Sequence, residues 1–488
     1  MTDHPPDEQQ VRLAKHKATL QSGGYPYQFD RTATAAELHQ RFSSLPPDAD
    51  SGVRAAVAGR LMLLRSFGRL VFATLQDGTG RIQLMADSAE LEQMDAFADL
   101  DVGDWVGAEG RVVTTRKGEL TVRIDRFALL AKALRPLPEK WHGLADRELR
   151  SRRRYLDLLV NEEARAVAQR RVAVLRALRK SFDERGFIEV ETPTLQLQAG
   201  GGLARPFVTH HNALDLDMYL RIALELPLKR LVIGGLERVF ELGRVFRNEG
   251  IDSTHNPEFT MLEAYQAFAD YEDMLQLVEG VIGEVVAATT GGTELTYQGR
   301  PLDLTPPYRR ARYLDLVQHA VNESIGFETP LHELRALVEA AGTEVHPSWG
   351  PGRLIAELFE QHVEPYIWQP TFVLDHPEET SPLARAHREG GSVVERFELI
   401  VAGAELVNAF SELNDPLEQR ARFEAQAEAR AAGEADTHPL DEDYLLALEY
   451  GLPPTGGLGL GVDRLVMLVT DQASIREVLL FPALRPDD

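Results

Sequence analysis

The amino-acid sequence predicts an α+β protein with two main domains, an N-terminal β-barrel and a larger antiparallel sheet flanked by helices. The chain has 488 residues, which is long for a single hydrophobic core and favours more than one domain. Residues 53–130 alternate apolar and polar side chains in five short runs, and glycine-bearing turns such as Asp77-Gly78 separate them. Beyond this region, helix and strand patterns alternate irregularly, which is typical of an antiparallel sheet with helices packed on it.

Four segments follow from these patterns. Residues 1–52 form an N-terminal helical extension, 53–132 the barrel, 133–146 a linker and 147–488 the larger domain. The linker is predicted from the prolines of ALRPLPEKWHG, because proline removes a backbone donor and disfavours helix before it. The larger domain opens with an amphipathic helix from about Glu163 to Arg185, and Gly186 provides the stop.

The composition excludes several classes of protein. The chain has no cysteine, which excludes disulfides, thiolate zinc sites and cysteine nucleophiles and fits a cytoplasmic protein. The N-terminus MTDHPPDEQQVRLAKHKATL has no apolar signal segment, and no apolar run is long enough for a membrane helix, so we expect neither secretion nor a membrane partner. A net charge of −24 argues against general coating of nucleic acid, although local basic clusters leave RNA binding open.

The segment RVFELGRVFRNEGIDSTHNPEFTMLEAYQA at 238–267 is the most informative part of the chain. It predicts two strands joined by a polar loop, and alternate residues of a strand share a face. Arg247 and Glu249 therefore point the same way, and so do Phe259, Glu263 and Tyr265. A face built only for packing would not carry these charges, because a buried charge without its partner costs on the order of 3–5 kcal/mol. The residue types indicate a ligand with a phosphate, a flat base and a cationic group.

Four segments resemble the class II aminoacyl-tRNA synthetases, in their lysyl-tRNA synthetase form. The similarity is carried by GFIEVETPTL at 186–195 (motif 1), FRNEG(x)nHNPEFTMLE within the hairpin (motif 2), RFELIVAGAELVNAFSELNDP at 396–416 and GGLGLGVDRLVML at 456–468 (motif 3). They follow in the order of the family, and the similarity runs from about Val53 to Pro486. The resemblance implies an OB-fold for the barrel, a class II synthetase sheet for 147–488, and a homodimer formed through motif 1.

An OB-fold reads single-stranded nucleic acid through a strand face and its loops. The resemblance implies that Phe72 stacks on an anticodon base of tRNA(Lys), and that Arg60, Gln83 and Glu119 make polar contacts. From the residues alone, Phe72 could also be a core residue of the barrel. Met85 stands where the family usually carries an aromatic side chain, which predicts a weaker second stacking platform.

The chain has no G-x-x-x-x-G-K-[ST] phosphate loop, so side chains must hold the nucleotide. The resemblance implies that Arg247 meets the α-phosphate and the amino-acid carboxylate of the substrates. It implies that Arg464 takes the γ-phosphate of ATP and one face of the adenine, and that Phe259 stacks on the other face. Glu249 would accept a hydrogen bond from the adenine amine, and His255 would contact the triphosphate. Arg247 and Arg464 are the expected catalytic residues.

Glu398 and Glu405 flank an apparent tight turn at Ala402-Gly403. If Val401 pairs with Ala404, both carboxylates fall on one face of the hairpin, where Mg²⁺ could bridge them to ATP. From the residues alone they could also be two exposed strand glutamates. The resemblance favours the Mg²⁺ site and gives Glu398 a further place among the ATP contacts.

Asn408, Phe410 and Glu412 have the opposite strand parity to the two hairpin glutamates. All five can face one site only if an extra residue interrupts the ladder. We therefore predict a β-bulge near Leu406 or Val407.

The expected amino-acid substrate follows from charge. Glu263 and Glu412, with Tyr265, would surround its side chain, and two carboxylates that meet no protein cation favour an ammonium group, hence lysine. The resemblance implies that Glu225 and the backbone near Gly201 hold the α-ammonium, with Asn408 near the carboxylate and Phe410 completing the lysine set. Leu224 and Pro227 depart from the family, which usually has Ala-Pro-Glu where this chain has Ala-Leu-Glu.

The implied reaction needs no protein nucleophile, because the ionised carboxylate of lysine can attack the α-phosphorus of ATP in line. Lysyl-adenylate would then pass its acyl group to the 3′-OH of tRNA(Lys). Three alternatives remain. The protein could be an aspartyl- or asparaginyl-tRNA synthetase; it could attach lysine to a protein, which the barrel disfavours; or it could be an inactive relative that binds RNA, which the intact motif residues disfavour.

Overall fold

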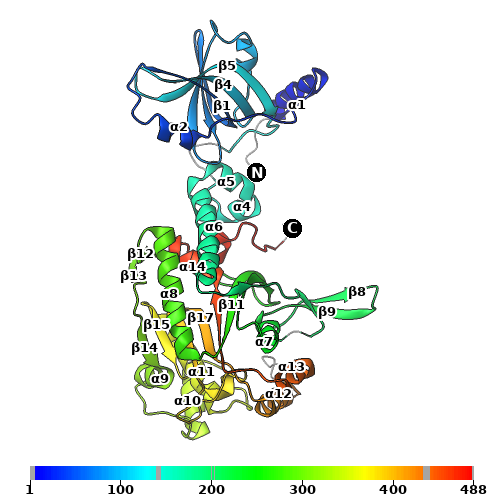
Figure 1. Cartoon of the computed structure of the whole chain (residues 1–488), viewed down its shortest axis with the longest axis vertical. Coiled ribbons are helices and arrows are strands. Elements are labelled where there is room, and N and C mark those ends of the chain that lie inside the picture. The colour runs from blue at the N-terminus through cyan, green and yellow to red at the C-terminus, as the bar shows by residue number, and fades with distance from the viewer. Residues whose placement is uncertain (1–5, 139–143, 199, 203, 432–439, 486–488) are drawn as a thin grey trace. The chain divides into compact units, whose positions relative to one another are not determined.

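The computed structural model describes residues 6–138, 144–198, 200–202, 204–431 and 440–485 (Figure 1). The chain divides into two compact units, residues 1–145 and 146–488. The predicted linker at 133–146 falls partly outside the described residues, at 139–143. No helix in the described ranges has both the length and the apolar character that a membrane span requires.

The first unit is a closed five-stranded barrel, as predicted. Its strands are β1 (Asp50–Phe67), β2 (Leu70–Gln76), β3 (Arg81–Asp87), β4 (Trp105–Thr114) and β5 (Leu120–Ala131), in the order β1-β2-β3-β5-β4. Inward side chains such as Leu61, Leu84 and Val122 are fully buried, as the period-2 alternation requires. Three helices accompany the barrel: α1 (Pro6–Gln21), α2 (Ala35–Arg41) and α3 (Met94–Ala98).

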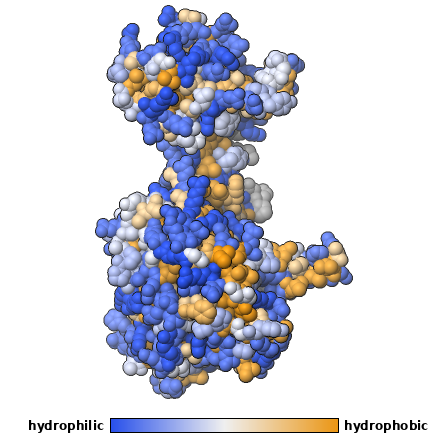
Figure 2. Space-filling view, in the orientation of Figure 1, coloured by the Kyte–Doolittle hydropathy of each residue, from blue (hydrophilic) through white to orange (hydrophobic). Residues whose placement is uncertain are grey.

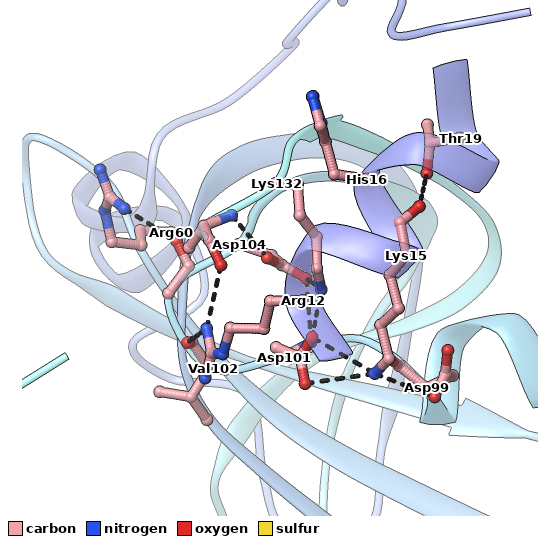
Figure 3. A network of polar contacts seen from close by, with 12 residues as sticks. Arg12, Lys15, His16, Thr19, Arg60, Asp99, Asp101, Val102, Asp104 and Lys132 are labelled. Carbon is pink, nitrogen blue, oxygen red and sulfur yellow. Dashed lines mark hydrogen bonds and ion pairs between the residues drawn. The ribbon is translucent and has the colours of Figure 1, made fainter. Parts of the chain in front are cut away.

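Helix α1 is attached to the barrel by charged side chains (Figure 3). Arg12 donates to the backbone carbonyl of Val102 at 3.0 Å. Lys15 donates to the carbonyl of Asp99 at 2.7 Å. On the barrel itself, Lys132 is almost fully buried and pairs with Asp104 at 2.8 Å and with Asp101. This polar network fixes a helix that has little apolar surface to bury.

The second unit is built on an eight-stranded sheet in the order β14-β15-β16-β17-β18-β11-β10-β6. Its centre is antiparallel, as predicted, but β14 pairs with β15 and β6 with β10 in parallel at the two edges. The strands are β6 (Ile188–Glu189), β10 (Arg238–Phe246), β11 (Glu258–Ala267), β14 (Arg309–Arg312), β15 (Thr371–Leu374), β16 (Arg396–Val401), β17 (Ala404–Ser411) and β18 (Thr455–Gly461). Outside this sheet lie the pair β12 (Glu294–Tyr297) and β13 (Arg300–Asp303) and the three-stranded sheet of β7 (Leu195–Gln196), β8 (Val208–His211) and β9 (Leu216–Leu220).

One face of this sheet is covered by helices, and the site lies on the opposite face, which other helices cover in part. Helix α8 (Tyr271–Thr290) packs over β17 and β18, and α6 (Glu162–Asp183) packs against α8 (Figure 1). Leu262 and Ala264 of β11 point into that core, so Glu263 and Tyr265 face the opposite way. The remaining helices are α4 (Arg147–Arg152), α5 (Arg154–Val160), α7 (Glu225–Ile233), α9 (Tyr313–Val321), α10 (Leu331–Ala340), α11 (Pro351–His362), α12 (Pro416–Ala431), α13 (Glu442–Glu449), α14 (Val462–Val469) and α15 (Ile475–Val478), with short 3₁₀ turns at Glu364–Tyr366 and Glu378–Thr380.

The predicted bulge is present in the β16–β17 hairpin. Val401 pairs with Ala404 across the turn and Ile400 pairs with Glu405, but Leu399 pairs with Val407. Leu406 is therefore the extra residue, and the prediction is confirmed. The insertion reverses the parity of the strand, so that side chains on both sides of it can reach one face of the sheet.

Candidate active site

A cavity of about 380 Å³ opens on the face of the large sheet that carries Glu263 and Tyr265. It collects residues from β11, β17 and β18, from the loop that follows β10, and from the loop that follows the 3₁₀ turn at Glu378–Thr380. The following residues of the expected site line it: Gly201, Glu225, Arg247, Glu249, His255, Phe259, Glu263, Tyr265, Glu405, Asn408, Phe410, Glu412 and Arg464. Glu398 is absent from the lining residues.

Arg247 and Glu249 lie just beyond β10, where the sequence had placed them on the strand. The ladder ends because the next residue opposite, Pro257, accepts from the Arg247 N–H at 2.9 Å but has no N–H to donate in return. The freed Arg247 side chain donates to the carbonyl of Ile222 at 3.4 Å, and its guanidinium carbon lies 5.1 Å from the centre of the Phe259 ring. A cation and a flat apolar ring therefore stand side by side in the cavity.

Arg464 enters the cavity from the first turn of α14. The neighbouring Asp463 accepts from the N–H of Thr260 on β11 at 2.7 Å and pairs with the buried Arg171 of α6 at 2.5 Å. Arg171 also donates to the Thr260 hydroxyl at 3.0 Å. This buried network holds the start of α14 against β11. Arg464 itself donates to the backbone carbonyl of Glu405.

The hairpin carboxylates lie beside a cation that the sequence analysis did not single out. Arg396 donates to Glu398 at 2.6 Å and to the amide oxygen of Asn408 at 3.0 Å. Burial raises the pKa of Glu398 to about 8; Arg396 opposes the shift, while Glu405 and Glu364 add to it. Strand parity could have identified Arg396, because it shares its face with Glu398.

Glu398 and Glu405 fit a magnesium ion that takes most of its ligands from ATP and water. In the described part of the chain, no group of three or more His, Cys, Asp or Glu side chains is arranged to hold a metal. Mg²⁺ sites commonly use only one or two protein carboxylates and complete the shell with phosphate oxygens and water. Repulsion between Glu398 and Glu405 is the kind of charge excess that a divalent cation would relieve.

The acidic end of the cavity is formed by Glu225, Glu263 and Glu412, with Tyr265. Glu263 accepts from the backbone N–H of Leu224 at 2.9 Å and from the Tyr265 hydroxyl at 3.1 Å. Burial, together with the nearby Glu225, raises the pKa of Glu263 to about 7. A buried carboxylate whose pKa is raised in this way would be stabilised in its ionised form by a cationic ligand, so Glu263 is a candidate binding residue for such a ligand.

The expectation that Glu263 and Glu412 both lack a protein cation is wrong for Glu412. Lys229 of α7 is fully buried and forms ion pairs with Glu412 and, at 2.5 Å, with Glu225. Its ammonium also lies 5.5 Å from the centre of the Phe410 ring. Lys229 follows Glu225 by four residues on a helix, and this spacing was the sequence signal for the Glu225 pair.

Comparison with known proteins agrees with this geometry. Residues 146–485 match the family described as tRNA synthetases class II (D, K and N), and residues 55–130 match the OB-fold nucleic acid binding domain. The chain is 50% identical over 482 residues to the lysine–tRNA ligase of Moorella thermoacetica, covering 98% of both chains. It is 51% identical over 485 residues to that of Synechococcus sp. (strain CC9311), covering 98% of this chain and 99% of the relative. The chain belongs to the lysine–tRNA ligase family of class II tRNA synthetases.

Membership in this family confirms the resemblance seen in the sequence. One residue that departs from the usual family sequence, Leu224, has a structural role in this chain. Leu224 is the residue whose N–H donates to Glu263, and a proline at this position could not make that hydrogen bond. The other departure, Pro227, lies within the first turn of α7, where proline is tolerated.

The barrel presents three of the four expected anticodon residues on or beside one face. Phe72 lies directly opposite Met85 on the β2–β3 ladder, and Gln83 pairs with Thr121 of β5. Glu119 precedes β5 by one residue and is exposed. Phe72 is only partly buried and contacts the exposed Phe67 edge to face, with 6.2 Å between ring centres, so it is not a residue of the barrel core.

Arg60 differs from the other three anticodon candidates. It lies near the far end of the β1–β2 ladder from Phe72, paired with Gln76. Its guanidinium donates to the carbonyl of Gly103 at 2.8 Å and lies 4.7 Å from the centre of the Trp105 ring. Burial lowers its pKa. The structure thus ties Arg60 to β4, at a distance along the barrel from the Phe72 face.

Proposed function

We propose that the chain joins L-lysine to tRNA(Lys) in two steps, through a lysyl-adenylate. The observation that carries this proposal is the continuity of one cavity, which is lined by Glu263 in its acidic part and by Arg247 beside Phe259. An ammonium group bound beside Glu263 and a nucleotide bound beside Arg247 and Phe259 would bring the carboxylate of lysine and the α-phosphate of ATP together.

In the first step, a carboxylate oxygen of lysine forms a bond to the α-phosphorus of ATP while the bond to the β-phosphate bridging oxygen breaks. Pyrophosphate leaves, and no proton needs to move because the carboxylate is already ionised. Arg247 holds the carboxylate and the α-phosphate in line, a task suited to a planar guanidinium. Arg464 meets charge on the leaving phosphates, while Glu249, His255 and Phe259 orient the nucleotide.

Two hairpin glutamates, Glu398 and Glu405, are the residues that would hold Mg²⁺. When bound, the ion supplies charge neutralisation on the phosphates of ATP. Arg396 keeps Glu398 in place through its 2.6 Å contact and leaves the amide N–H of Asn408 free to meet the lysine carboxylate.

In the second step, the 3′-OH of tRNA attacks the acyl carbon of the adenylate, and AMP leaves. The barrel would select the tRNA by stacking an anticodon base on Phe72, with polar contacts from Gln83 and Glu119. Arg60 would contribute from the β4 side.

We also propose a homodimer formed around motif 1. Exposed apolar side chains on α6, β6, β7 and β8 and in the loop after β7 support this proposal: Val172, Ile188, Leu195, Leu197 and Val208 are each between 44% and 70% exposed. Figure 2 shows apolar surface on the arm that β8 and β9 form in Figure 1. Such exposed apolar surface is typical of a face that another chain covers.

The experiment that tests the activity is ATP–pyrophosphate exchange with lysine, aspartate and asparagine in turn. We expect exchange with lysine alone, because an acidic pocket repels aspartate. Exchange with aspartate but not lysine would refute the proposal. Arg247→Ala should abolish lysine-dependent exchange while the far-ultraviolet circular dichroism stays unchanged, and retained exchange would refute the role of Arg247.

A further inference from the structure

Lys229 is a buried cation that the proposed chemistry does not use. Its side chain is fully buried on the inner side of α7, next to the acidic end of the cavity. Three titratable groups face its ammonium: Glu225 on the same helix, Glu412 after β17, and Tyr444 of α13, whose ring centre is 5.9 Å away. The two carboxylates it meets are also expected ligands of the substrate.

The number of charged groups at the acidic end of the cavity suggests what Lys229 does. The acidic end holds Glu225, Glu263 and Glu412 against the single ammonium of Lys229. Among the described groups, Glu263 interacts with Glu225, Glu412, Arg247, the Tyr265 hydroxyl and the Leu224 N–H. Lysine would bring an α-ammonium and an ε-ammonium, while its carboxylate would meet Arg247. Three cationic groups would then face three carboxylates.

We propose that Lys229 is a positioning residue that sets the charge of the lysine pocket, so that the pocket is balanced only by an amino acid with two ammonium groups. This inference rests on the proposed lysine pocket. Lys229 also spaces Glu225 and Glu412, because one ammonium between two carboxylates keeps them from repelling one another. A neutral side chain at position 229 would leave one negative charge without a partner when lysine is bound.

The charge balance predicts an unusual pattern among three variants. Lys229→Met leaves three carboxylates for two substrate ammonium groups, and Glu412→Gln leaves two carboxylates for three cations. Each should lower kcat/KM for lysine about 100-fold near neutral pH, since each leaves a buried charge unpaired. The double variant has two carboxylates for two ammonium groups. It should therefore exceed both single variants, although it lacks more native groups than either.

The pH dependence separates this role from simple packing. Burial raises the pKa of Glu412, and Lys229 acts against that shift. Without Lys229, the pKa of Glu412 should rise further, and protonation of this carboxyl would remove the negative charge that has no partner. The loss in Lys229→Met should therefore be smaller at about pH 7 than at about pH 9, where Glu412 is ionised more fully. A packing defect would lower kcat/KM for lysine by the same factor at both pH values.

The measurement is lysine-dependent ATP–pyrophosphate exchange on the full chain, with KM for ATP determined alongside and expected to change by less than about two-fold. Lys132→Met is the matched control, because Lys132 is an equally buried, ion-paired lysine in the other unit. It should leave KM for lysine unchanged. If Lys229→Met does not fold, the comparison of Glu412→Gln with the double variant still tests the proposal, which requires the double variant to have the higher kcat/KM for lysine.

Losses that simply multiply in the double variant, with no pH dependence in Lys229→Met, would overturn the role of Lys229. Failure of the proposed function gives a different result, since the wild-type chain would then not use lysine in exchange at all.

Discussion

At the scale of single residues, the N–H of Leu224 decides how Glu263 is held. Glu263 has two neutral donors, this N–H and the Tyr265 hydroxyl, at the end of the cavity where a cation is expected. A backbone donor favours the ionised carboxylate and opposes the effect of burial on its pKa. Leu224 thus helps to hold Glu263 ionised through its backbone N–H and not through its side chain.

Leu224→Pro should weaken lysine binding. It removes the N–H donor, so the pKa of Glu263 rises further and the carboxylate is less available near neutral pH. We expect kcat/KM for lysine to fall about ten-fold or more, the value of a hydrogen bond to a charged group. Exchange kinetics against pH would show a smaller loss at higher pH. Leu224→Ala keeps the N–H and is the control; an equal loss in both variants would assign the effect to packing.

Glu263→Gln should stabilise the ligand-free protein above neutral pH while impairing lysine binding. The native pKa of Glu263 is about 7 against an ordinary value of 4.5, so the folded state holds more protons in that window. Stability contributed by this group is therefore present at low pH and lost as pH rises through about 7, a loss on the order of 3 kcal/mol.

Urea unfolding near pH 5 and pH 8 measures this effect. Glutamine does not ionise, so the variant should gain stability over the wild type at the higher pH, with a smaller gain at the lower pH. A variant less stable than the wild type at both would contradict the raised pKa.

At the scale of elements, two features of the central strands shape the pocket. The bulge at Leu406 brings Glu405 and Glu412 to the same cavity in spite of their opposite parity. The glycines of β18 let Glu412 and Tyr265 approach the neighbouring backbone. A Cβ added at Gly457 would lie 1.9 Å from a carboxylate oxygen of Glu412 and 2.5 Å from the Tyr265 ring.

Gly457→Ala should therefore raise KM for lysine sharply and leave KM for ATP nearly unchanged. The new methyl group must displace Glu412 or Tyr265, the groups expected to contact the lysine side chain. Gly461→Ala is the control on the same strand, because its Cβ would meet protein atoms only at 3.6 Å or beyond. Steady-state exchange kinetics of both variants provide the measurement. Equal KM values for lysine in Gly457→Ala and the wild type would show that Glu412 tolerates the shift.

At the scale of the whole molecule, the division into two compact units predicts separable functions. Phe72 belongs to the barrel, and the cavity belongs to the second unit. Phe72→Leu should leave exchange unchanged and raise KM for tRNA, since base stacking on an aromatic ring contributes about 1–3 kcal/mol. Aminoacylation with tRNA(Lys) at several salt concentrations would measure it. An unchanged KM for tRNA in Phe72→Leu would show that the Phe72 ring has a structural role and does not stack on a base.

Much of the architecture could be predicted because it depends on local pattern. Alternation and glycine turns predicted the five strands of the barrel, and strand parity with a two-residue turn predicted the bulge at Leu406. Motif spacing brought together the residues that line the cavity, with Glu398 as the exception because Arg396 holds its carboxylate. The strand limit at Phe246 was missed, since it depends on which residue lies opposite Pro257.

The sequence by itself determined which chemical groups are available: arginines and a ring for a nucleotide, carboxylates for a cation, and a barrel for nucleic acid. Only the tertiary structure decided how the charges are shared. Lys229 and Glu412 are 183 residues apart, and nothing in either segment specifies that they meet. Their pairing arises because α7 packs on β10 and β11, on the face of the sheet where the site lies, and a buried ammonium must then be neutralised by whichever carboxylates the fold places beside it.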